Sequence, residues 1–338
     1  TDLAEIQPTI FPAVPRILEK MHSSALVKMK DASYVKRLLF KFSTFLGDIA
    51  VERKLNKNFD DFLAKILLSI GYILSFRSLR KKLGLQRAEF AASGAAPIAP
   101  EVLKFFMSIG VPLFEAYGMT ENCAYATSNS PENIKIGTVG VPAHGVELKL
   151  AEDGEILIRS GGVFKGYFKD EQATNETIDK DGWLYTGDVG IFEGDFVKIV
   201  DRKRDIIITS GGKNVSPSEI ENKIKVSPFV KEAIVIGDRR KFLSVLIGIE
   251  FDTVSNWALR KNIPHTTYRD LSEKQEVKDL VWKEILKANE KTSSLEVREF
   301  RMIPKELDHE EGELTATQKV KRNVLIEQFS DLIEEMYS

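Results

Sequence analysis

The sequence contains few of the residues that build disulfides and metal clusters: its 338 residues include one cysteine and four histidines. A single cysteine excludes an intramolecular disulfide and a cysteine-based zinc cluster, so a reducing compartment fits. No histidine lies near Cys123 in the sequence to activate it as a nucleophile, and we expect a buried structural thiol there. The histidines do not fall at the spacing of metal ligands, which favours surface or satisfied positions. They are His22, His144, His265 and His309.

An excess of charge of one sign, a long apolar run and a secretion signal are missing as well. The 48 basic and 50 acidic residues give a net charge of −2, which argues against a nucleic-acid-binding protein. The longest apolar run, residues 62–76, is 15 residues long and contains Lys65, whereas a membrane-spanning helix needs about 20 residues. No secretory signal is visible, and the sequence starts with Thr1 rather than Met. We expect a cytoplasmic protein and a sequence that begins inside a longer one.

The strongest local signal is the segment 114–122, where an apolar run ends in a ring, a glycine, a hydroxyl and a carboxylate. Tyr117 can stack on a flat base, and Gly118 lets a ligand approach the backbone closely. Thr120 offers a hydroxyl to a phosphate oxygen, and Glu121 offers hard oxygens to Mg²⁺. A tyrosine that closes an ordinary β-α turn would give a similar pattern.

Around this segment the sequence predicts a β-α-β arrangement. Its elements are a strand over 88–92, a helix over 100–109 that Gly110 ends, and a strand over 111–116. Ligands of open parallel sheets bind beyond the carboxyl ends of the strands. We therefore expect the loop 93–97 to face the same site as Tyr117, with a plain βα turn as the alternative. Its small residues are Gly94, Ala95 and Ala96.

Residues 137–200 alternate apolar and polar positions between glycine turns, which predicts a small β-barrel or sandwich. Within it, Asp188 follows a Thr-Gly turn. A carboxylate at that point can accept both hydroxyls of a ribose. The alternative is an Asx turn.

A run of charges at 201–205 separates apolar segments and predicts an interdomain linker, or else a hairpin tip. Residues 209–214 resemble a phosphate loop, but Ile207 and Asn214 depart from the Walker A pattern, which counts against a P-loop NTPase. A capping box at Ser216 opens a small α+β domain. Its predicted elements are strands over 231–237, 243–250 and 297–303, helices near 252–262 and 272–291, and a terminal helix over about 320–333.

Residues 31–87 are basic and predict helices. Apolar residues recur at helical spacing beside the charges. They are Leu38, Leu39, Phe42, Phe45 and Leu46. A basic amphipathic segment of this kind can lie on an anionic membrane surface. The alternative is a helical insertion that packs on its own domain.

Taken in order, these motifs resemble the adenylate-forming (ANL) superfamily and, within it, the long-chain fatty-acid–CoA ligases, over nearly the whole chain. The fatty-acyl subgroup is indicated by segments 14–20, 154–167 and 314–322 and by the helical insertion before Ser93. The resemblance implies an α/β plus α+β fold. It implies the remainder of a large domain over 1–200 (helical insertion 31–87, βαβ sheet 88–136, β-barrel 137–200), a hinge over 201–205 and a mobile small domain over 206–338.

The family's reaction implies the substrates fatty acid, ATP and CoA, with Mg²⁺: the acid and ATP give acyl-AMP, and CoA then displaces AMP. By resemblance, Gly94, Ala95 and Ala96 would lie along the adenine, Tyr117 would stack on it, and Gly118 would belong to the same nucleotide-binding segment. Thr120 would contact phosphate, and Glu121 would hold Mg²⁺. The remaining matches are Asp188 and Arg202 for the ribose and Lys319 for the charge that grows between carboxylate and α-phosphate.

The resemblance also implies that the small domain rotates between the two half-reactions, after which Gly211 and Gly212 line the CoA tunnel. The hinge position is Arg204, where relatives more often have Lys or Asp. The planar guanidinium makes more fixed contacts than an ammonium group.

The family's Ser/Thr/Gly-rich phosphate loop is absent from the sequence. We expect it upstream of Thr1, so that this chain is the C-terminal part of the enzyme, lacks its N-terminal half and binds ATP weakly. The alternatives are an aryl- or medium-chain CoA ligase, another adenylation domain, or a non-catalytic fragment that binds a partner. The sequence leaves open a homodimer and peripheral membrane contact through 31–87.

Overall fold

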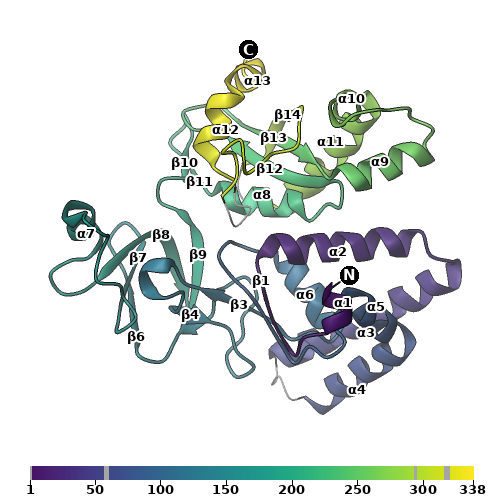
Figure 1. Ribbon diagram of the computed structural model, residues 1–338, viewed down its shortest axis with the longest axis horizontal. Coiled ribbons are helices and arrows are strands. Elements are labelled where there is room, and N and C mark those ends of the chain that lie inside the picture. Colours follow the sequence, from purple (N-terminus) through teal and green to yellow (C-terminus); the bar gives the residue numbers. More distant parts are fainter. Residues whose placement is uncertain (1, 57–60, 293–294, 316–319) are drawn as a thin grey trace. The chain divides into compact units, whose positions relative to one another are not determined.

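The computed structural model describes residues 2–56, 61–292, 295–315 and 320–338. The chain divides into two compact units, Thr1–Arg204 and Asp205–Ser338 (Figure 1). The division falls within the segment 201–205, although Asp201 and Arg202 are the last residues of a strand rather than a free linker.

The first unit contains a five-stranded sheet in the order β1-β2-β3-β4-β5. Its strands are β1 Ile10–Ala13, β2 Phe90–Ser93, β3 Leu113–Tyr117, β4 Thr127–Ser128 and β5 Val141–Pro142. β1, β2 and β3 are parallel, whereas β4 and β5 join in antiparallel pairing. The predicted β-α-β arrangement is confirmed, with Tyr117 as the last residue of β3 instead of the first residue beyond it.

Helices precede and connect the first three strands of this sheet. They are α1 Asp2–Ile6, α2 Pro15–Lys30, α3 Tyr34–Asn56, α4 Phe62–Gly71, the π-helix η1 Tyr72–Phe76, α5 Arg77–Leu83 and α6 Pro100–Ser108. α6 buries Val102, Phe105 and Phe106, and Gly110 follows it with φ +82°, the left-handed conformation that ends helices.

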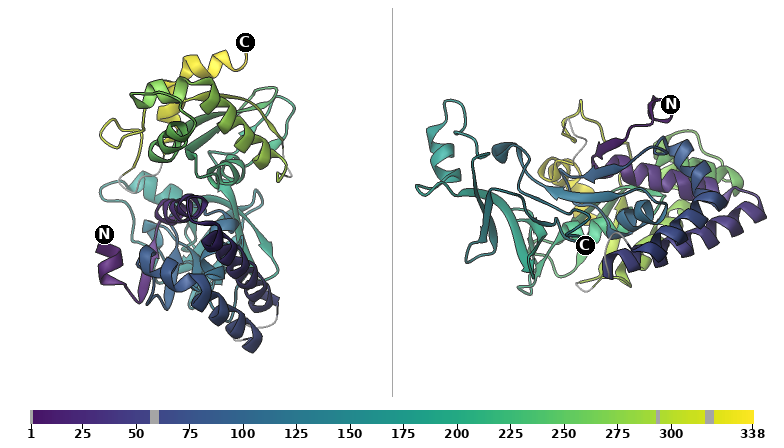
Figure 2. Two further views of the ribbon diagram at one scale, coloured as in Figure 1. Left: turned by 90° about the vertical axis from the view of Figure 1, so that its right-hand side faces the viewer. Right: turned by 90° about the horizontal axis from the view of Figure 1, so that it is seen from below.

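The predicted helical segment 31–87 forms a hairpin in which α3 and α4 lie side by side (Figure 2). α3 packs closely on α6, because a Cβ on Gly47 would lie 2.2 Å from the carbonyl oxygen of Ser108. At the other end, the Arg80 guanidinium donates to the carbonyls of Leu85, Gln86, Ala88 and Gly110 at 3.0–3.2 Å. The hairpin is therefore an integral part of the first unit.

The structure extends the apolar run 62–76 into one continuous helical stretch, Phe62–Leu83, of 22 residues. That stretch is long and apolar enough to cross a membrane, so its length no longer excludes a span. Length and composition alone are weak evidence, because a core helix satisfies the same criterion.

The region 137–200 forms a four-stranded antiparallel sheet in the order β6-β7-β8-β9. Its strands are β6 Val146–Leu150, β7 Glu155–Ser160, β8 Leu184–Glu193 and β9 Phe196–Arg202, with the short helix α7 Glu171–Thr177 between β7 and β8. β5 contacts both edge strands, β6 and β9, so the sheet curls around a core that includes Ile156, Ile158 and Val197. The predicted alternation of short strands and glycine turns thus corresponds to an antiparallel sheet.

The second unit begins with a hairpin and contains a three-stranded sheet in the order β12-β13-β14. Its elements are β10 Ile207–Ile208, β11 Asn214–Val215, α8 Pro217–Lys225, β12 Val230–Ile236, β13 Leu243–Ile249, α9 Phe251–Arg260, α10 Tyr268–Glu273, α11 Gln275–Asn289, β14 Val297–Met302, α12 Arg322–Gln328 and α13 Ser330–Glu335. β12 alternates between two cores: Ala233 and Val235 belong to one, Ile234 and Ile236 to the other. Because successive side chains of a strand point to opposite faces, both faces of this sheet are covered.

Two segments that were each predicted as one helix are divided into two helices. The predicted helix 272–291 is two helices, because Lys274 takes an extended conformation (φ −61°, ψ 133°) between α10 and α11. The terminal helix is interrupted at Phe329, whose ring is buried. The buried residues continue on both sides of each break, so the apolar spacing alone did not reveal it.

The prediction of a buried thiol was also wrong, since Cys123 is exposed and adopts φ +57°. Among the histidines, His22 is buried against the ring of Phe105, with ring centroids 4.6 Å apart. Burial lowers the pKa of His22 to about 4. His265 hydrogen-bonds Ser255 at 2.7 Å, as expected for a satisfied histidine.

Candidate active site

The chain turns tightly after β3. A Cβ on Gly118 would lie 2.2 Å from the carbonyl carbon of Ala124, so this position accepts glycine only. The N–H of Ala126 donates to the carbonyl of Tyr117 at 3.1 Å and closes the loop. Within the loop, Thr120–Asn122 form the 3-10 helix η2. Thr120 is exposed, and Glu121 is half-buried.

The predicted adenine loop lies at the neighbouring strand end, because β2 and β3 are adjacent and parallel. A Cβ on Gly94 would approach the carbonyl oxygen of Ala116 to 3.2 Å, which places this glycine against the end of β3. Ala95 adopts φ +70°, a strained conformation for a residue with a side chain. The loop and Tyr117 therefore occupy the same edge of the sheet.

Three residues that are far apart in the sequence meet in this unit. The Tyr117 hydroxyl donates to Asp188 Oδ2 at 2.7 Å. Arg202 Nε lies 3.6 Å from Asp188 Oδ1 across the β8-β9 pair. Asp188 is 8% exposed, and burial, then the Asp188 charge, raises the pKa of Tyr117. The phenol therefore stays protonated and keeps its donor role.

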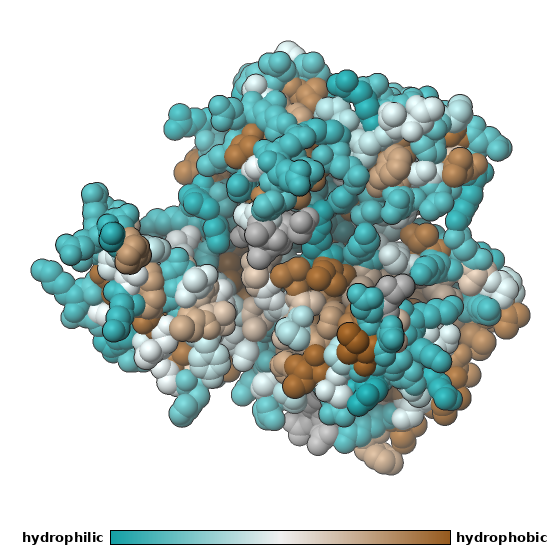
Figure 3. All heavy atoms as spheres, viewed as in Figure 1, coloured by the Kyte–Doolittle hydropathy of each residue, from teal (hydrophilic) through white to brown (hydrophobic). Residues whose placement is uncertain are grey.

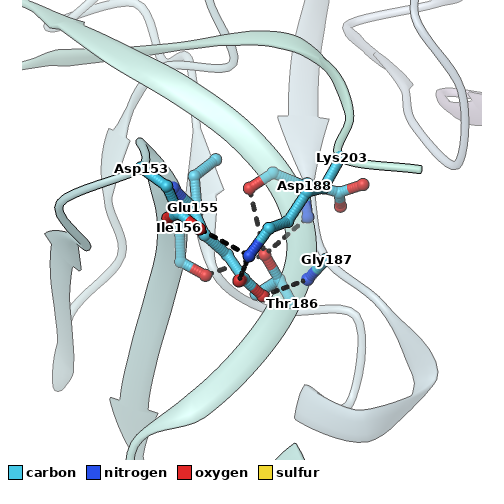
Figure 4. Close-up of polar contacts among 7 residues, drawn as sticks. All are labelled: Asp153, Glu155, Ile156, Thr186, Gly187, Asp188 and Lys203. Atoms are coloured by element: carbon cyan, nitrogen blue, oxygen red, sulfur yellow. Dashed lines mark hydrogen bonds and ion pairs between the residues drawn. The ribbon is translucent and has the colours of Figure 1, made fainter. Parts of the chain in front are cut away.

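The backbone around Asp188 is fixed by several polar contacts (Figure 4). The Asp188 N–H donates to Thr186 Oγ1 at 3.1 Å, and that hydroxyl donates to the Ile156 carbonyl at 2.8 Å. The Gly187 N–H donates to Glu155 Oε1 at 2.8 Å. Gly187 adopts φ +71°, which a glycine tolerates at little cost. β8 is therefore irregular at the point where it presents Asp188.

Glu121 has one partner on a segment that the sequence did not assign to the site. The Tyr167 hydroxyl donates to Glu121 Oε1 at 2.9 Å, and the Phe164 N–H donates to the Glu121 carbonyl at 2.7 Å. Among the described residues no three acidic, histidine or cysteine side chains gather as a metal site. Mg²⁺ is often held by one or two carboxylates together with substrate phosphates, so Glu121 with the Thr120 hydroxyl nearby fits that donor set.

Glu115 lies on β3 two residues before Tyr117 and is 8% exposed. Burial raises the pKa of its carboxyl to about 8, against a hydrogen bond from the Ile98 backbone that lowers it. In the sequence, Glu115 stands only as part of the largely apolar segment that precedes Tyr117. A carboxylate within an otherwise apolar strand was the available signal.

The other predicted residues belong to the second unit or to its boundary. Gly211 and Gly212 lie in the turn of the β10-β11 hairpin, where the Gly212 N–H donates to the Thr209 carbonyl at 2.9 Å. Arg204 is exposed at the end of the first unit.

Lys319 lies outside the described residues, but the chain on either side of it is fixed. Leu314 and Val320 form an isolated antiparallel bridge, and the Lys321 N–H donates to the Glu313 carbonyl at 2.8 Å. Glu313 is fully buried, with Lys305 Nζ at 2.7 Å from Oε1. Arg322 pairs with Glu221 at 2.5 Å.

Sequence comparison identifies the class of protein. A model of AMP-binding enzymes matches residues 1–168, and a model of the AMP-binding enzyme C-terminal domain matches residues 204–338. The chain belongs to the AMP-binding enzymes, which form the adenylate-forming (ANL) superfamily.

Two relatives indicate which AMP-binding enzymes this chain is most usefully compared with. The long-chain-fatty-acid–CoA ligase FadD15 of Mycobacterium bovis is 34% identical over 341 residues, covering 99% of this chain and 56% of that protein. The long-chain-fatty-acid–CoA ligase ACSBG2 of Xenopus laevis is 31% identical over 360 residues, covering 99% of this chain and 48% of that protein. The chain thus spans about half the length of the curated relatives it matches.

A solved structure supports the fold. The A domain of the carboxylic acid reductase of Segniliparus rugosus, in complex with AMP and a co-purified carboxylic acid, matches with a TM-score of 0.66 at 21% identity. The match covers 99% of this chain and 48% of that chain. The expected fold class, part of an ANL large domain followed by a small α+β domain, is confirmed.

Proposed function

We propose that this chain is the C-terminal part of a long-chain fatty-acid–CoA ligase, which converts a fatty acid and ATP to acyl-AMP and pyrophosphate and then transfers the acyl group to CoA. The observation that carries the proposal is the Tyr117–Asp188–Arg202 cluster in a chain whose relatives are such ligases. These three residues join the end of β3 to the β8-β9 pair. A ribose and its base would be bound side by side at this point.

The residues divide the work by their chemistry. Asp188 can accept the two ribose hydroxyls, and Arg202 limits the cost of keeping that carboxylate charged. Tyr117, held by its hydroxyl, presents its ring to the base beside the Gly94–Ala95–Ala96 loop, while Thr120 donates to phosphate. Glu121 would hold Mg²⁺, which supplies charge neutralisation to the phosphates. Lys319 would stabilise the charge that develops on the α-phosphate oxygens.

The same proposal assigns roles to the second unit. Rotation about Arg204 would exchange Lys319 for the Gly211–Gly212 turn. A Cβ on Gly212 would meet no atom within 4 Å, which leaves open space for a passing CoA chain. We propose a cytoplasmic location for the whole enzyme. A homodimer remains a proposal that sedimentation equilibrium tests directly.

The experiment supplies each half-reaction separately to this chain. With palmitoyl-AMP and CoA, we expect palmitoyl-CoA and AMP; with ATP, Mg²⁺, palmitate and CoA, we expect little AMP, because the family's phosphate loop is not in the sequence. Asp188→Asn should weaken AMP binding, with Asp195→Asn in the β8-β9 turn as the matched control. Robust AMP release from ATP would contradict the assignment of this chain as a part of the enzyme.

Failure of both half-reactions, together with no AMP binding by calorimetry, would favour the non-catalytic alternative, a fragment that binds a partner. Acyl-chain-length profiling of the complete enzyme separates the long-chain ligase from aryl- and medium-chain ligases. Lys319→Ala in the complete enzyme should slow adenylation far more than thioester formation from supplied acyl-AMP, and equal losses would contradict its role.

We also propose that the α3-α4 hairpin contacts an anionic lipid surface. It exposes an apolar surface, the hairpin patch, at the lower right of Figure 3. Its residues are Val35, Leu38, Phe42, Phe45, Phe62, Leu63, Ile66, Ile70 and Ile73. Residues 31–87 contain 12 Lys and Arg against 5 Asp and Glu, a net charge of +7 in a chain whose total is −2. Exposed apolar side chains beside cationic ones are what an anionic membrane surface binds.

Co-sedimentation with vesicles tests this contact. The chain should bind phosphatidylcholine vesicles that contain phosphatidylglycerol, bind pure phosphatidylcholine less, and dissociate as salt rises. Phe42→Ser/Ile73→Ser lowers the apolar contribution and Lys81→Gln/Lys82→Gln lowers the positive charge, and each double variant should reduce binding. Absence of binding at low salt would contradict the contact, and concentration-dependent dimers that Phe42→Ser/Ile73→Ser abolishes would show that a second copy covers the patch.

A further inference from the structure

Glu155, the first residue of β7, is a buried carboxylate with two partners on two different segments (Figure 4). It is 7% exposed. Its Oε1 accepts the Gly187 N–H at 2.8 Å, and its Oε2 lies 2.9 Å from Lys203 Nζ. A buried carboxylate is stable only when its oxygens are satisfied in this way. Glu155 therefore joins the Gly187 segment of β8 to the residue that follows β9.

The first partner belongs to the segment that presents Asp188. Gly187 directly precedes Asp188, and its left-handed φ of +71° turns its N–H toward Glu155. The next N–H, that of Asp188, donates to Thr186 Oγ1 at 3.1 Å. The direction in which Asp188 leaves the backbone is thus set from β7.

The second partner stands at the exit of the first unit. Lys203 follows Arg202, and the unit ends one residue later, at Arg204. Its Nζ also pairs with Asp153 Oδ2 at 2.5 Å, and its N–H donates to the Gly187 carbonyl at 2.9 Å. Hydrogen bonds to Asp153 and Glu155 raise the pKa of Lys203, so the ammonium stays charged. Side chain and backbone of Lys203 are both tied to the Glu155–Gly187 pair.

We propose that Glu155 is a positioning residue: through the Gly187 N–H it orients Asp188 for the nucleotide ribose, and through Lys203 it ties that orientation to the chain at the unit boundary. We call the hydrogen bond from the Gly187 N–H to Glu155 the first tie, and the ion pair of Glu155 with Lys203 the second tie. The identity of the ligand rests on the proposed function, whereas these two contacts do not. A purely stabilising ion pair would contribute to folding without controlling either the Gly187 amide or the boundary.

Variants of the 338-residue chain separate the two ties. Glu155→Gln keeps a carbonyl oxygen for the Gly187 N–H and loses the ion pair with Lys203. Glu155→Ala loses both contacts. Lys203→Met loses only the ion pairs. Asp153→Asn is the matched control, because Asp153 pairs with Lys203 without contacting Gly187, and asparagine keeps the Oδ1 that accepts the Glu155 N–H.

Hydrogen exchange of peptides that contain Gly187 reads the first tie without any nucleotide. We expect exchange to accelerate at least about tenfold in Glu155→Ala, the effect of losing one charge-assisted hydrogen bond, and by less than about threefold in Glu155→Gln and Asp153→Asn. Calorimetric AMP affinity should follow the same order, with rescue by Gln. Tryptic cleavage after Arg204 reads the second tie and should accelerate in Lys203→Met and Glu155→Gln but not in Asp153→Asn.

The proposal is overturned if Glu155→Ala lowers the unfolding temperature while Gly187 exchange, AMP affinity and cleavage after Arg204 match those of the unaltered chain. If Glu155→Ala does not fold, Glu155→Gln and Lys203→Met still test the proposal, through hydrogen exchange at Gly187 and tryptic cleavage after Arg204. If the unaltered chain binds no AMP, the proposed function fails while Gly187 exchange still decides the first tie.

Discussion

Two regions of the first unit reverse the usual relation between hydrophobicity and burial. Around the end of β3, the carboxylates Glu115, Glu155 and Asp188 are 8%, 7% and 8% exposed. On the hairpin patch, Phe62 and Ile73 are 78% and 79% exposed. Burying a carboxylate costs free energy unless it is partnered, and exposing a large apolar side chain forgoes the benefit of burial. Each region therefore carries a local cost in free energy unless its side chains find partners.

The two costs are met differently. The buried carboxylates Glu155 and Asp188 have partners at 2.7–3.6 Å within the unit, so the polar region is complete and pre-organised. The hairpin patch has no such compensation in the described residues. Its α3 residues lie opposite the buried face of that helix, where Phe40, Leu46 and Ala50 pack. A complete polar cluster suits a small polar ligand, whereas an uncovered apolar face suits a larger apolar surface.

The largest expected effect concerns the pH dependence of the polar region. The pKa of Glu115 is raised from 4.5 to about 8 in the folded state. Between pH 4.5 and pH 8 the folded chain therefore holds a proton at Glu115 that it releases on unfolding. The free energy of unfolding contributed by this group is therefore fully present below about pH 4.5 and falls as pH rises through 8. A shift of that size corresponds to roughly 5 kcal/mol across the window. Glu115→Gln should remove this decline, measured by hydrogen exchange of β3 peptides from pH 5 to 8.5.

Glu115→Gln carries its own control, because a glutamine and a protonated glutamate are both neutral and of similar shape. The variant should match the unaltered chain near pH 5 and exceed it in stability near pH 8. Parallel stability curves for the two proteins would mean that Glu115 ionises normally and that its burial is relieved by solvent.

A smaller effect is expected from the link between the two sheets. Tyr117→Phe removes the hydrogen-bond donor to Asp188 and keeps the Arg202 contact at 3.6 Å. Losing a hydrogen bond to a charged acceptor should destabilise the first unit by about 1–2 kcal/mol. The ring remains for stacking, so AMP affinity should fall by less than about tenfold. Tyr125→Phe, at an exposed ring in the same segment, is the control, and equal effects of the two variants would contradict the role of the contact.

The sequence predicted several residues of the candidate site and missed others, and the particular residues show why. Tyr117, Asp188 and Arg202 were predicted as parts of one site by resemblance, and the structure brings them together. Glu155 and Lys203 were missed because neither stands in an unusual local pattern: their roles come from the register of β7, β8 and β9, which joins residues 48 positions apart.

Local periodicity also fails where burial is decided by packing between distant segments. Leu38, Phe42 and Phe45 recur at helical spacing as a core face would, yet they are exposed, because Gly47 and its neighbours turn the other face of α3 toward α6. The exposure of Cys123 follows from the tight turn after Gly118, a three-dimensional constraint that residue type does not encode.

The smallest expected effect tests whether the hairpin patch contributes to folding. Ile73 is 79% exposed, so Ile73→Ser should change the free energy of unfolding by no more than about 0.5 kcal/mol. Phe76, three residues later in the same helical stretch, is fully buried, and Phe76→Ala should cost about 3–5 kcal/mol. Thermal unfolding, followed by hydrogen exchange of peptides from the helical stretch Phe62–Leu83, measures both effects. A cost for Ile73→Ser comparable to that of Phe76→Ala would mean that the patch is already covered in solution. A difference of several kcal/mol would leave the apolar surface free for the lipid contact, since a side chain that adds nothing to folding is available to bind another surface.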